Sequence, residues 1–564
     1  MSVADIHDPE DGKGSMKAEY PDMDGSGVDD LGTPGEEATR IARATGLMGG
    51  LTVTSRILGL LRDIAQAAIL GTGMAADAFT LGFIIPNTLR RLFGESTTSA
   101  AFVPTYVETL GKDSRREAFR LGSRILTLVA TVLLVLVAAG MIAAPLLVRL
   151  FAPGFGEIPG KTQLAAGLLR LLFPYILVVG CAAVVGGILH AHRHFTAPAS
   201  APILFNLSAL AGILLLSRWI FPEQPVWGYS IGVLIGGVLQ LLVQIPALRR
   251  RGFSFRPDFN WSTPKIRRIG MLAFPALVGL LAAEVNIIID KMIASLLEPG
   301  SVAALAYGNR IMQFPQGVFA ISLATALLPT LSRQTSSGKL TDAGRTLGRA
   351  TLALAAFMIP ATICMVLLAR PVVEVLLARG AFTQKSTLLT SSALVYYSAG
   401  LMFYGAVKIT VPVFYAMKDT RTPVKIAVGC MGLNIILNFL FTIMFIRTGL
   451  AEPLAGLALA TSVASLANFV ILRITLKRRL GGIVPASRRA WLAMFPAAAL
   501  SLCIVILLMP WVAGSSSLSA VRGVVSILAA SSAATVAFLA VFFLAGGRAA
   551  RSVFSLAFRR GSIR

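Results

Sequence analysis

Residues 121–149 read LGSRILTLVATVLLVLVAAGMIAAPLLVR, and between Arg124 and Arg149 this stretch contains no charged side chain. An α-helix needs about 20 apolar residues to cross the hydrocarbon core of a bilayer, and this run is long enough. Its Leu, Val and Ala residues follow one another without the alternation that is typical of strands in a membrane barrel. The stretch therefore predicts a transmembrane helix.

Similar runs recur along the chain and indicate its class. Of the 564 residues, 55% are hydrophobic and only 14% are charged. Because unpaired backbone groups cannot face lipid, we expect an all-α integral membrane protein. We predict about fourteen transmembrane helices, at residues 44–70, 75–98, 121–149, 162–189, 198–219, 227–248, 269–297, 302–331, 346–369, 386–416, 423–446, 451–476, 489–511 and 519–545.

The charge distribution predicts the orientation of these helices. The formal net charge is +24, but residues 1–40 carry eleven acidic and only three basic side chains. We interpret residues 1–43 as a disordered, acidic cytoplasmic tail, because they lack the apolar segment of a signal peptide. Arg and Lys are concentrated in alternate loops and in a basic tail at 548–564. The positive-inside rule therefore predicts that both termini lie in the cytoplasm.

Two pairs of segments indicate an internal repeat. FVPTYVE at 102–108 is similar to LLPTLSR at 327–333, and ILHAHRHFTAP at 188–198 is similar to VFYAMKDTRTP at 413–423. The second pair matches Arg193 with Lys418, and both pairs are 225 residues apart. Since six predicted helices separate the copies, the two halves should have the same orientation in the membrane, as in transporters that use alternating access.

The repeat predicts the domain organisation. We expect two parallel six-helix lobes, an N-lobe at 44–250 and a C-lobe at 251–480. Residues 481–547 would add helices 13 and 14, which could form a groove for a lipid tail or simply brace the lobes.

Charged side chains recur in predicted helices 1, 2 and 8. A charge at the bilayer centre costs about 2.5–3.5 kcal/mol on insertion scales, so each must face a partner or a cavity. Arg91 and Glu95 could pair as i,i+4 neighbours, but the arginines outnumber nearby acids. Arginine also binds phosphate through planar, bidentate contacts. We favour phosphate binding over purely structural pairing, with candidate substrate-binding residues Arg56, Arg62, Asp63, Asp77, Asn87, Arg90, Arg91, Glu95 and Arg310.

A second polar group offers candidate ligands for a cation. Asp290 lies deep in predicted helix 7, Asn434 and Asn438 share one face of helix 11, and Thr461 lies in helix 12. Oxygen ligands of this kind suit Na⁺, but we favour the alternative in which Asp290 pairs with the adjacent Lys291 or with a neighbouring helix. We expect no organic cofactor. Nucleic-acid binding is not expected either, because no soluble domain or aromatic platform is present.

Several segments of the chain form recognisable motifs: SRILGLLRD (55–63), GTGMAADAF (71–79), IIPNTLRRLFGE (84–95), AFVP (101–104), FPYI (173–176), NRIMQFPQGVF (309–319) and DTRTPVKIA (419–427). These motifs resemble the MurJ (MviN) family of lipid II flippases in the MOP exporter superfamily. The similarity extends from about residue 44 to residue 480.

The resemblance implies a V-shaped, charged cavity and a lipid groove at helices 13 and 14. It also implies coupling to Na⁺, H⁺ or the membrane potential. Positions that match functional family positions are Arg56, Arg62, Asp77, Arg90, Arg91 and Arg310. Many members have acidic residues where this chain has Asn309 and Gln313, so a protonation switch at those two positions is not expected here.

We therefore predict a transporter, not an enzyme. It would move the peptidoglycan precursor lipid II from the cytoplasmic to the periplasmic leaflet, with membrane lipids and possible cell-wall synthesis proteins as further partners. Two alternatives stay open: a flippase for another polyprenyl-linked oligosaccharide, and a MOP-type cation or drug antiporter. An enzyme acting on polyprenyl phosphates would need clustered acids or histidines at one membrane face, and the sequence has no such motif.

Overall fold

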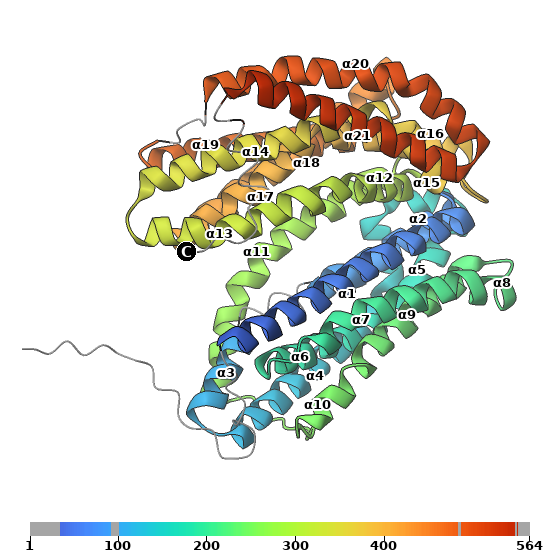
Figure 1. The fold of residues 1–564 in the computed structure, drawn as a ribbon. Helices are drawn as coiled ribbons and strands as arrows, with labels where there is room; N and C mark the ends of the chain where they lie inside the picture. The colour runs from blue at the N-terminus through green and yellow to red at the C-terminus, as the bar shows by residue number, and fades with distance from the viewer. Residues whose placement is uncertain (1–33, 92–100, 483–486, 548–549, 551–564) are drawn as a thin grey trace, which may run out of the picture.

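A computed structural model describes residues 34–91, 101–482, 487–547 and 550 (Figure 1). No strand occurs among these residues, which confirms the all-α class. The N-terminal half contains α1 (Pro34–Leu70), α2 (Met74–Arg90), α3 (Val103–Lys112), α4 (Arg115–Phe151), η3 (Pro153–Glu157), α5 (Lys161–Leu172), α6 (Pro174–Ala191), α7 (Thr196–Ala211), η4 (Gly212–Leu216), α8 (Ser217–Trp219), α9 (Pro225–Leu242) and α10 (Ile245–Arg250).

The C-terminal half follows after a long connection. Its first helix, α11, leads from one half to the other. The elements are α11 (Pro264–Ser295), α12 (Ser301–Pro315), η5 (Gln316–Ala320), α13 (Ile321–Ser336), α14 (Leu340–Leu367), α15 (Ala369–Leu377), α16 (Gln384–Ala399), α17 (Leu401–Ala416), α18 (Arg421–Thr448), α19 (Ala455–Arg479), α20 (Arg488–Leu518) and α21 (Ala520–Ala545).

Ten helical spans in the described part of the chain are long and apolar enough to cross a membrane, and the pair α16–α17, bent by 47°, makes an eleventh. The other three predicted helices, at 44–70, 75–98 and 269–297, correspond to α1, α2 and α11. They are absent from those eleven spans, and they carry most of the charged candidate residues. The structure is compatible with fourteen crossings, and that count stays a prediction.

Local signals explain where several helices begin. The Ser114 side chain accepts a hydrogen bond from the backbone N–H of Glu117 and so caps α4. Thr383 and Ser386 form a reciprocal capping box at the start of α16. Such caps satisfy backbone donors that a helix leaves unpaired in its first turn.

The helices form two lobes that diverge at one end and meet at the other (Figure 1). Helices α1–α10 make the N-lobe and α11–α19 the C-lobe, while α20 and α21 pack together on the C-lobe. Phe538 and Phe542 of α21 are buried in a cluster with Leu352 and Ala356 of α14. We call the diverging end, which carries α3, α10 and α13, the wide end, and the other the narrow end.

The turns that follow α6 and α17 share an unusual backbone conformation. Arg193 (φ 55°) and Lys418 (φ 59°) are the two non-glycine residues with positive φ in the described part of the chain. In each turn the next residue donates a hydrogen bond from its backbone N–H to the carbonyl five positions earlier. His194 donates to Leu189 at 2.8 Å, and Asp419 donates to Phe414 at 2.9 Å. This match at an offset of 225 residues supports the predicted repeat.

At the narrow end the lobes meet through main-chain atoms. The N–H of Ala381 donates to the carbonyl of Ala68 at 2.7 Å. A Cβ at Gly71 would lie 2.4 Å from the carbonyl oxygen of Ala381, and one at Gly380 would lie 2.3 Å from that of Ala68. Both glycines also have positive φ, so this close approach requires residues without side chains.

Candidate functional site

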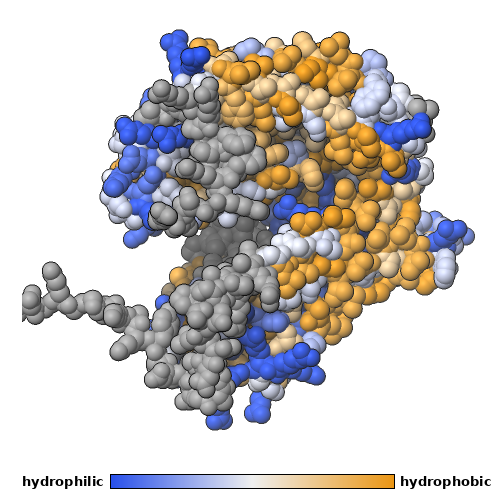
Figure 2. Space-filling view, in the orientation of Figure 1, coloured by the Kyte–Doolittle hydropathy of each residue, from blue (hydrophilic) through white to orange (hydrophobic). Residues whose placement is uncertain are grey.

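A cavity of about 620 Å³ lies between the lobes, with walls from α1, α2, α6, α7 and α9 of the N-lobe and α11, α12 and α16 of the C-lobe. Figure 2 shows hydrophilic residues inside the hollow between the two halves, while much of the visible outer surface is hydrophobic. A polar hollow with an apolar exterior can hold a charged group away from lipid.

Asp63 is the centre of the ionic contacts on α1. Its Oδ1 is 2.8 Å from Nη2 of Arg62, and its Oδ2 is 2.6 Å from Nε of Arg310 on α12. Arg62 also donates to Asn206 Oδ1 on α7, at 3.1 Å. Arg62 and Asp63 are buried, whereas the Arg310 side chain is 58% exposed. Arg310 is therefore the more available of the two arginines for a ligand in the cavity.

A second carboxylate, Glu284 on α11, contacts the end of α2. Its Oε1 is 3.0 Å from Nη1 of Arg91, and its Oε2 accepts a hydrogen bond from Thr88 at 2.8 Å. Glu284 is buried, and Arg91 is 41% exposed. Our sequence analysis missed Glu284, although an acidic residue inside an apolar predicted helix was a usable signal.

Two further predicted site residues, Asn87 and Arg90, lie near the end of α2. Arg90 donates through Nε to Asn87 Oδ1 at 3.1 Å, and both line the cavity. The partner of Arg91 within the described residues is Glu284, and the predicted pairing of Arg91 with Glu95 stays a prediction. Glu95 itself lies outside the described residues.

Cationic side chains outnumber carboxylates in the cavity wall. Lys291, buried on α11, adds a cation whose Nζ donates to the carbonyl of Val302 at 3.0 Å. Five cationic side chains therefore face three carboxylates among the described lining residues. The charged residues among the described lining are Arg62, Arg90, Arg91, Lys291 and Arg310 against Asp63, Glu284 and Asp290.

Arg56 lies outside this set of lining residues. It is exposed on α1, two turns from Arg62 towards the wide end. Its guanidinium group lies close to Gly317 of η5 in the C-lobe, since a Cβ at Gly317 would be 3.3 Å from Nη1. The structure therefore places Arg56 at the edge between the two lobes.

Asp77 is also outside the cavity lining, and its carboxylate is occupied by other groups. Its Oδ2 is 2.8 Å from Nζ of Lys161 and accepts from the N–H of Gly300 at 2.8 Å, while Oδ1 accepts from that of Ala303 at 2.8 Å. The side chains of Asp77 and Lys161 are both almost fully buried. Asp77 thus caps α12 across the lobe boundary, where an anion is favoured by the helix dipole.

The four candidate Na⁺ ligands lie together in the C-lobe. Asn438 Nδ2 donates to Asp290 Oδ1 at 2.7 Å and to Asn434 Oδ1 at 3.1 Å. Asn434 Nδ2 is 3.4 Å from Thr461 Oγ1. Asp290 thus bonds an amide, while Lys291 bonds a backbone carbonyl. No cluster of three or more His, Cys, Asp or Glu occurs in the described residues, so a cation here would need amide and hydroxyl oxygens.

Polar contacts outside the membrane spans also occur at the wide end of the N-lobe, where α11 begins. Glu108 of α3 accepts from Lys112 at 3.0 Å and from Arg268 of α11 at 2.9 Å, and both lower the pKa of its carboxyl. In the turn after α6, burial lowers the pKa of His192 to about 4, helped by the charges of Arg115 and Arg251. Its ring is therefore neutral near pH 7.

Comparison with known proteins gives one consistent family. The family described as "Lipid II flippase MurJ" matches residues 66–541. The chain is 34% identical over 508 residues to the "Probable lipid II flippase MurJ" of Rhizobium tropici, covering 89% of this chain and 93% of the relative. It is 32% identical over 443 residues to the protein of that description from Vibrio cholerae serotype O1, covering 77% and 82%.

Solved structures agree with these relatives. "Lipid II flippase MurJ, inward closed conformation" superposes with a TM-score of 0.69 at 27% identity, covering 86% of this chain and 98% of that chain. An inward-facing multidrug resistance MATE transporter of the MOP superfamily superposes with a TM-score of 0.61 at 15% identity, covering 77% and 98%. The second likeness shows the fold alone.

Proposed function

The chain belongs to the lipid II flippase MurJ family, and from this premise we propose how its cavity carries the substrate. It is a multi-pass membrane transporter for lipid II rather than an enzyme.

The cationic excess of the cavity wall binds the pyrophosphate of lipid II. Arg310 is the main contact, because its guanidinium is more than half exposed while still anchored to Asp63. Arg90 at the end of α2 and Arg91 directly after it line the same cavity and complete the site. A polyphosphate offers the oxygens that arginine binds in bidentate geometry. This surplus of positive charge in the cavity wall is the observation that carries the proposal.

Lipid II enters sideways from the inner leaflet at the edge where Arg56 faces Gly317. The headgroup passes Arg56 first and then reaches Arg310, while the polyprenyl tail stays in lipid or follows a groove at α20 and α21. Rocking of the lobes about the narrow end then exposes the headgroup on the other side. This order gives Arg56 a role in entry although it does not line the cavity.

Transport is coupled to a cation at the C-lobe set of Asp290, Asn434, Asn438 and Thr461. Three oxygen-bearing side chains around one carboxylate favour Na⁺. Coupling to H⁺ or to the membrane potential is the alternative. We further propose a bacterial inner-membrane location with both termini cytoplasmic, which would place the wide end at the cytoplasm, near cell-wall synthesis proteins.

Complementation tests the proposal. Cells depleted of their own lipid II flippase would express this chain, and the exposure of lipid II at the periplasmic face would be measured alongside growth. Wild type should restore both, whereas Arg310→Ala and Arg56→Ala should restore neither despite normal insertion. Arg370→Ala removes an exposed arginine paired with Glu374 on α15 and is the matched control. Full rescue by Arg310→Ala would disprove the pyrophosphate site.

A further inference from the structure

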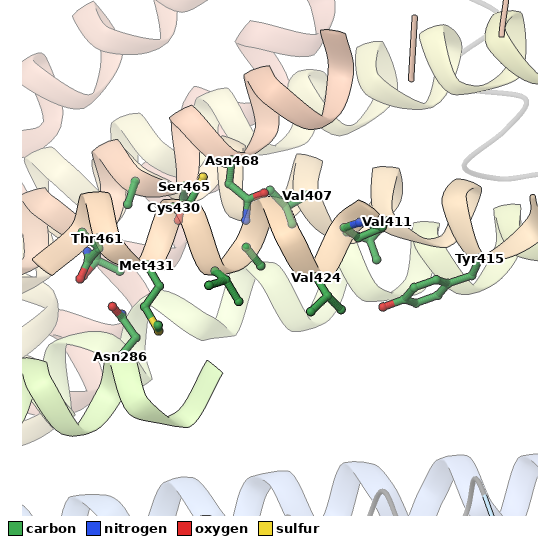
Figure 3. Close-up of a pocket in the computed structure, with 15 residues that line it drawn as sticks. Asn286, Val407, Val411, Tyr415, Val424, Cys430, Met431, Thr461, Ser465 and Asn468 are labelled. Atoms are coloured by element: carbon green, nitrogen blue, oxygen red, sulfur yellow. The ribbon is translucent and has the colours of Figure 1, made fainter. Parts of the chain in front are cut away.

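A second pocket, of about 350 Å³, lies inside the C-lobe between α17, α18 and α19, beside α11 (Figure 3). We call it the C-lobe pocket. Its described lining includes Val, Ala and Pro side chains but no acidic or basic residue. The amide and hydroxyl groups in it come from Asn286, Asn434, Thr461, Ser465, Asn468 and Tyr415.

The amides and hydroxyls form rows along the helices. Asn286 lies one turn before Asp290 on α11, and Asn434 lies one turn before Asn438 on α18, so each pair shares a helix face. Figure 3 shows Thr461, Ser465 and Asn468 following one another along α19. The rows extend from Asp290 and Asn438 through Asn434 and Thr461 towards Asn468.

Several oxygens along these rows are buried without a hydrogen-bond partner. They are Oδ1 of Asn286, Asn438 and Asn468, and none has a partner in the part of the chain that the structure describes. The orientation of Asn438 is set by its Nδ2, which donates to both Asp290 and Asn434. Each unpaired buried polar atom costs about 1–3 kcal/mol. The two in the pocket lining, on Asn286 and Asn468, and the third on Asn438 next to Asn434 indicate a guest that satisfies oxygen acceptors along the rows.

The two ends of the pocket lie at different places in the fold. One end reaches Tyr415, Pro423 and Val424, beside the turn at Lys418 that belongs to the wide end. At the other end, Asn434 connects through Asn438 to Asp290, which also lines the central cavity. Asp290 therefore stands between the C-lobe pocket and the substrate cavity.

We propose that the C-lobe pocket is the path along which a monovalent metal cation such as Na⁺ moves between the wide end and the Asp290 carboxylate. The route rests on the proposed ion coupling at Asp290. Along it the cation would contact further oxygen ligands, above all those of Asn468 and Asn286. Neutral amide oxygens replace part of the hydration shell of a hard cation. They also hold it weakly enough for it to move on.

Other guests fit the lining less well. An anion would find no basic side chain in the described lining, and a lipid tail would leave the amide oxygens unsatisfied. A single carboxylate at the end of the path matches a single positive charge. Entry from the wide end also keeps the cation away from the arginines of the central cavity.

Cysteine labelling tests access to the pocket. In a variant with Cys181, Cys364, Cys430 and Cys503 replaced by alanine, Ser465→Cys would be exposed to a charged methanethiosulfonate reagent in inside-out and right-side-out vesicles. The matched control is Leu466→Cys, the exposed neighbour on the same helix, where a thiol in lipid reacts poorly. We expect labelling from the wide end to be at least about tenfold faster for Ser465→Cys, and to be slowed by Na⁺ but not choline. Equal rates, or no effect of Na⁺, would overturn the route.

Exchange of bound ²²Na⁺ in the purified full-length protein separates the route from the ion coupling itself. Asp290→Asn should abolish binding, while Asn468→Leu should bind the same amount at saturation but exchange it about tenfold more slowly, a change of about 1.4 kcal/mol in the barrier. Asn468→Asp, a conservative change in size, should exchange faster than Asn468→Leu. If wild type binds no Na⁺, the proposed coupling ion is wrong; if binding needs Asp290 but Asn468→Leu exchanges normally, only the route is wrong.

Discussion

Asp63 on α1 and Arg310 on α12 are joined across the lobe boundary, with 2.6 Å between Oδ2 and Nε. The same carboxylate holds Arg62 through its other oxygen. The Asp63 carboxylate therefore forms ion pairs with one buried arginine, Arg62, and one exposed arginine, Arg310. A phosphate that arrives in the cavity can contact Arg310 without taking Arg62 from its partners on the N-lobe.

Replacing Asp63 by asparagine should harm folding more than replacing Arg310 by alanine. Asp63→Asn leaves the buried Arg62 without its carboxylate, and breaking a buried pair costs about 3–5 kcal/mol. Thermal unfolding in detergent would measure the loss. Asp63→Glu is the control that keeps the charge, and equal stability of Asp63→Asn and wild type would show that Asn206 alone supports Arg62.

Removing the Glu284 carboxylate should make the cavity more attractive to anions. Glu284→Gln keeps a hydrogen bond from Thr88 but releases Arg91 from its ion pair. We expect tighter binding of a pyrophosphate lipid and a steeper fall of affinity with added salt, because one more cation is free to bind phosphate. Titration at two ionic strengths measures both. Weaker binding in Glu284→Gln would show that Glu284 positions Arg91 for the substrate.

The Asp77–Lys161 pair should stabilise the state in which the narrow end is closed. Asp77→Asn leaves Lys161 buried without a charged partner and weakens the cap on α12. The expected loss is about 3–5 kcal/mol, and Asp77→Asn combined with Lys161→Met should lose less than the two single changes added together.

Labelling of a cysteine at Thr72 would report the closure. It should react faster from the narrow end in Asp77→Asn than in the otherwise wild-type chain, since the Thr72 side chain bonds Ser386 across the lobe boundary. The same labelling rate in both would assign Asp77 to folding alone.

The turn after α6 should make stability fall in mild acid. Burial, followed by the charges of Arg115 and Arg251, lowers the pKa of His192 to about 4, against about 6.5 in an unfolded chain. Between these values the unfolded state binds a proton that the folded state does not, so the free energy of unfolding falls as pH falls.

Unfolding temperatures measured between pH 7 and pH 4.5 would show this effect. Wild type should lose more stability over that range than His192→Gln, which cannot take up the proton. Identical pH dependence in the two proteins would exclude His192 as a source of the acid sensitivity.

Local and periodic features were predictable from the sequence. The matched turns at Arg193 and Lys418 were found as part of the repeat because similar residues at a fixed offset adopt similar backbone. The set of Asp290, Asn434, Asn438 and Thr461 was predictable because polar side chains in apolar helices must contact other polar groups or a cavity. Contacts between lobes were not predictable, because no local rule pairs Glu284 with Arg91 or brings Asp77 to the start of α12.

The glycines at the narrow end have a consequence for the speed of transport. Gly71 and Gly380 let main chain touch main chain, so the hydrogen bond from Ala381 to Ala68 can break without any change of side-chain rotamer. This contact therefore adds no side-chain rearrangement to those that the neighbouring contacts, Thr72 with Ser386 and Asp77 with the start of α12, already require. A methyl group at either glycine would instead hold the two loops apart in every cycle, leaving a leak between the two aqueous compartments.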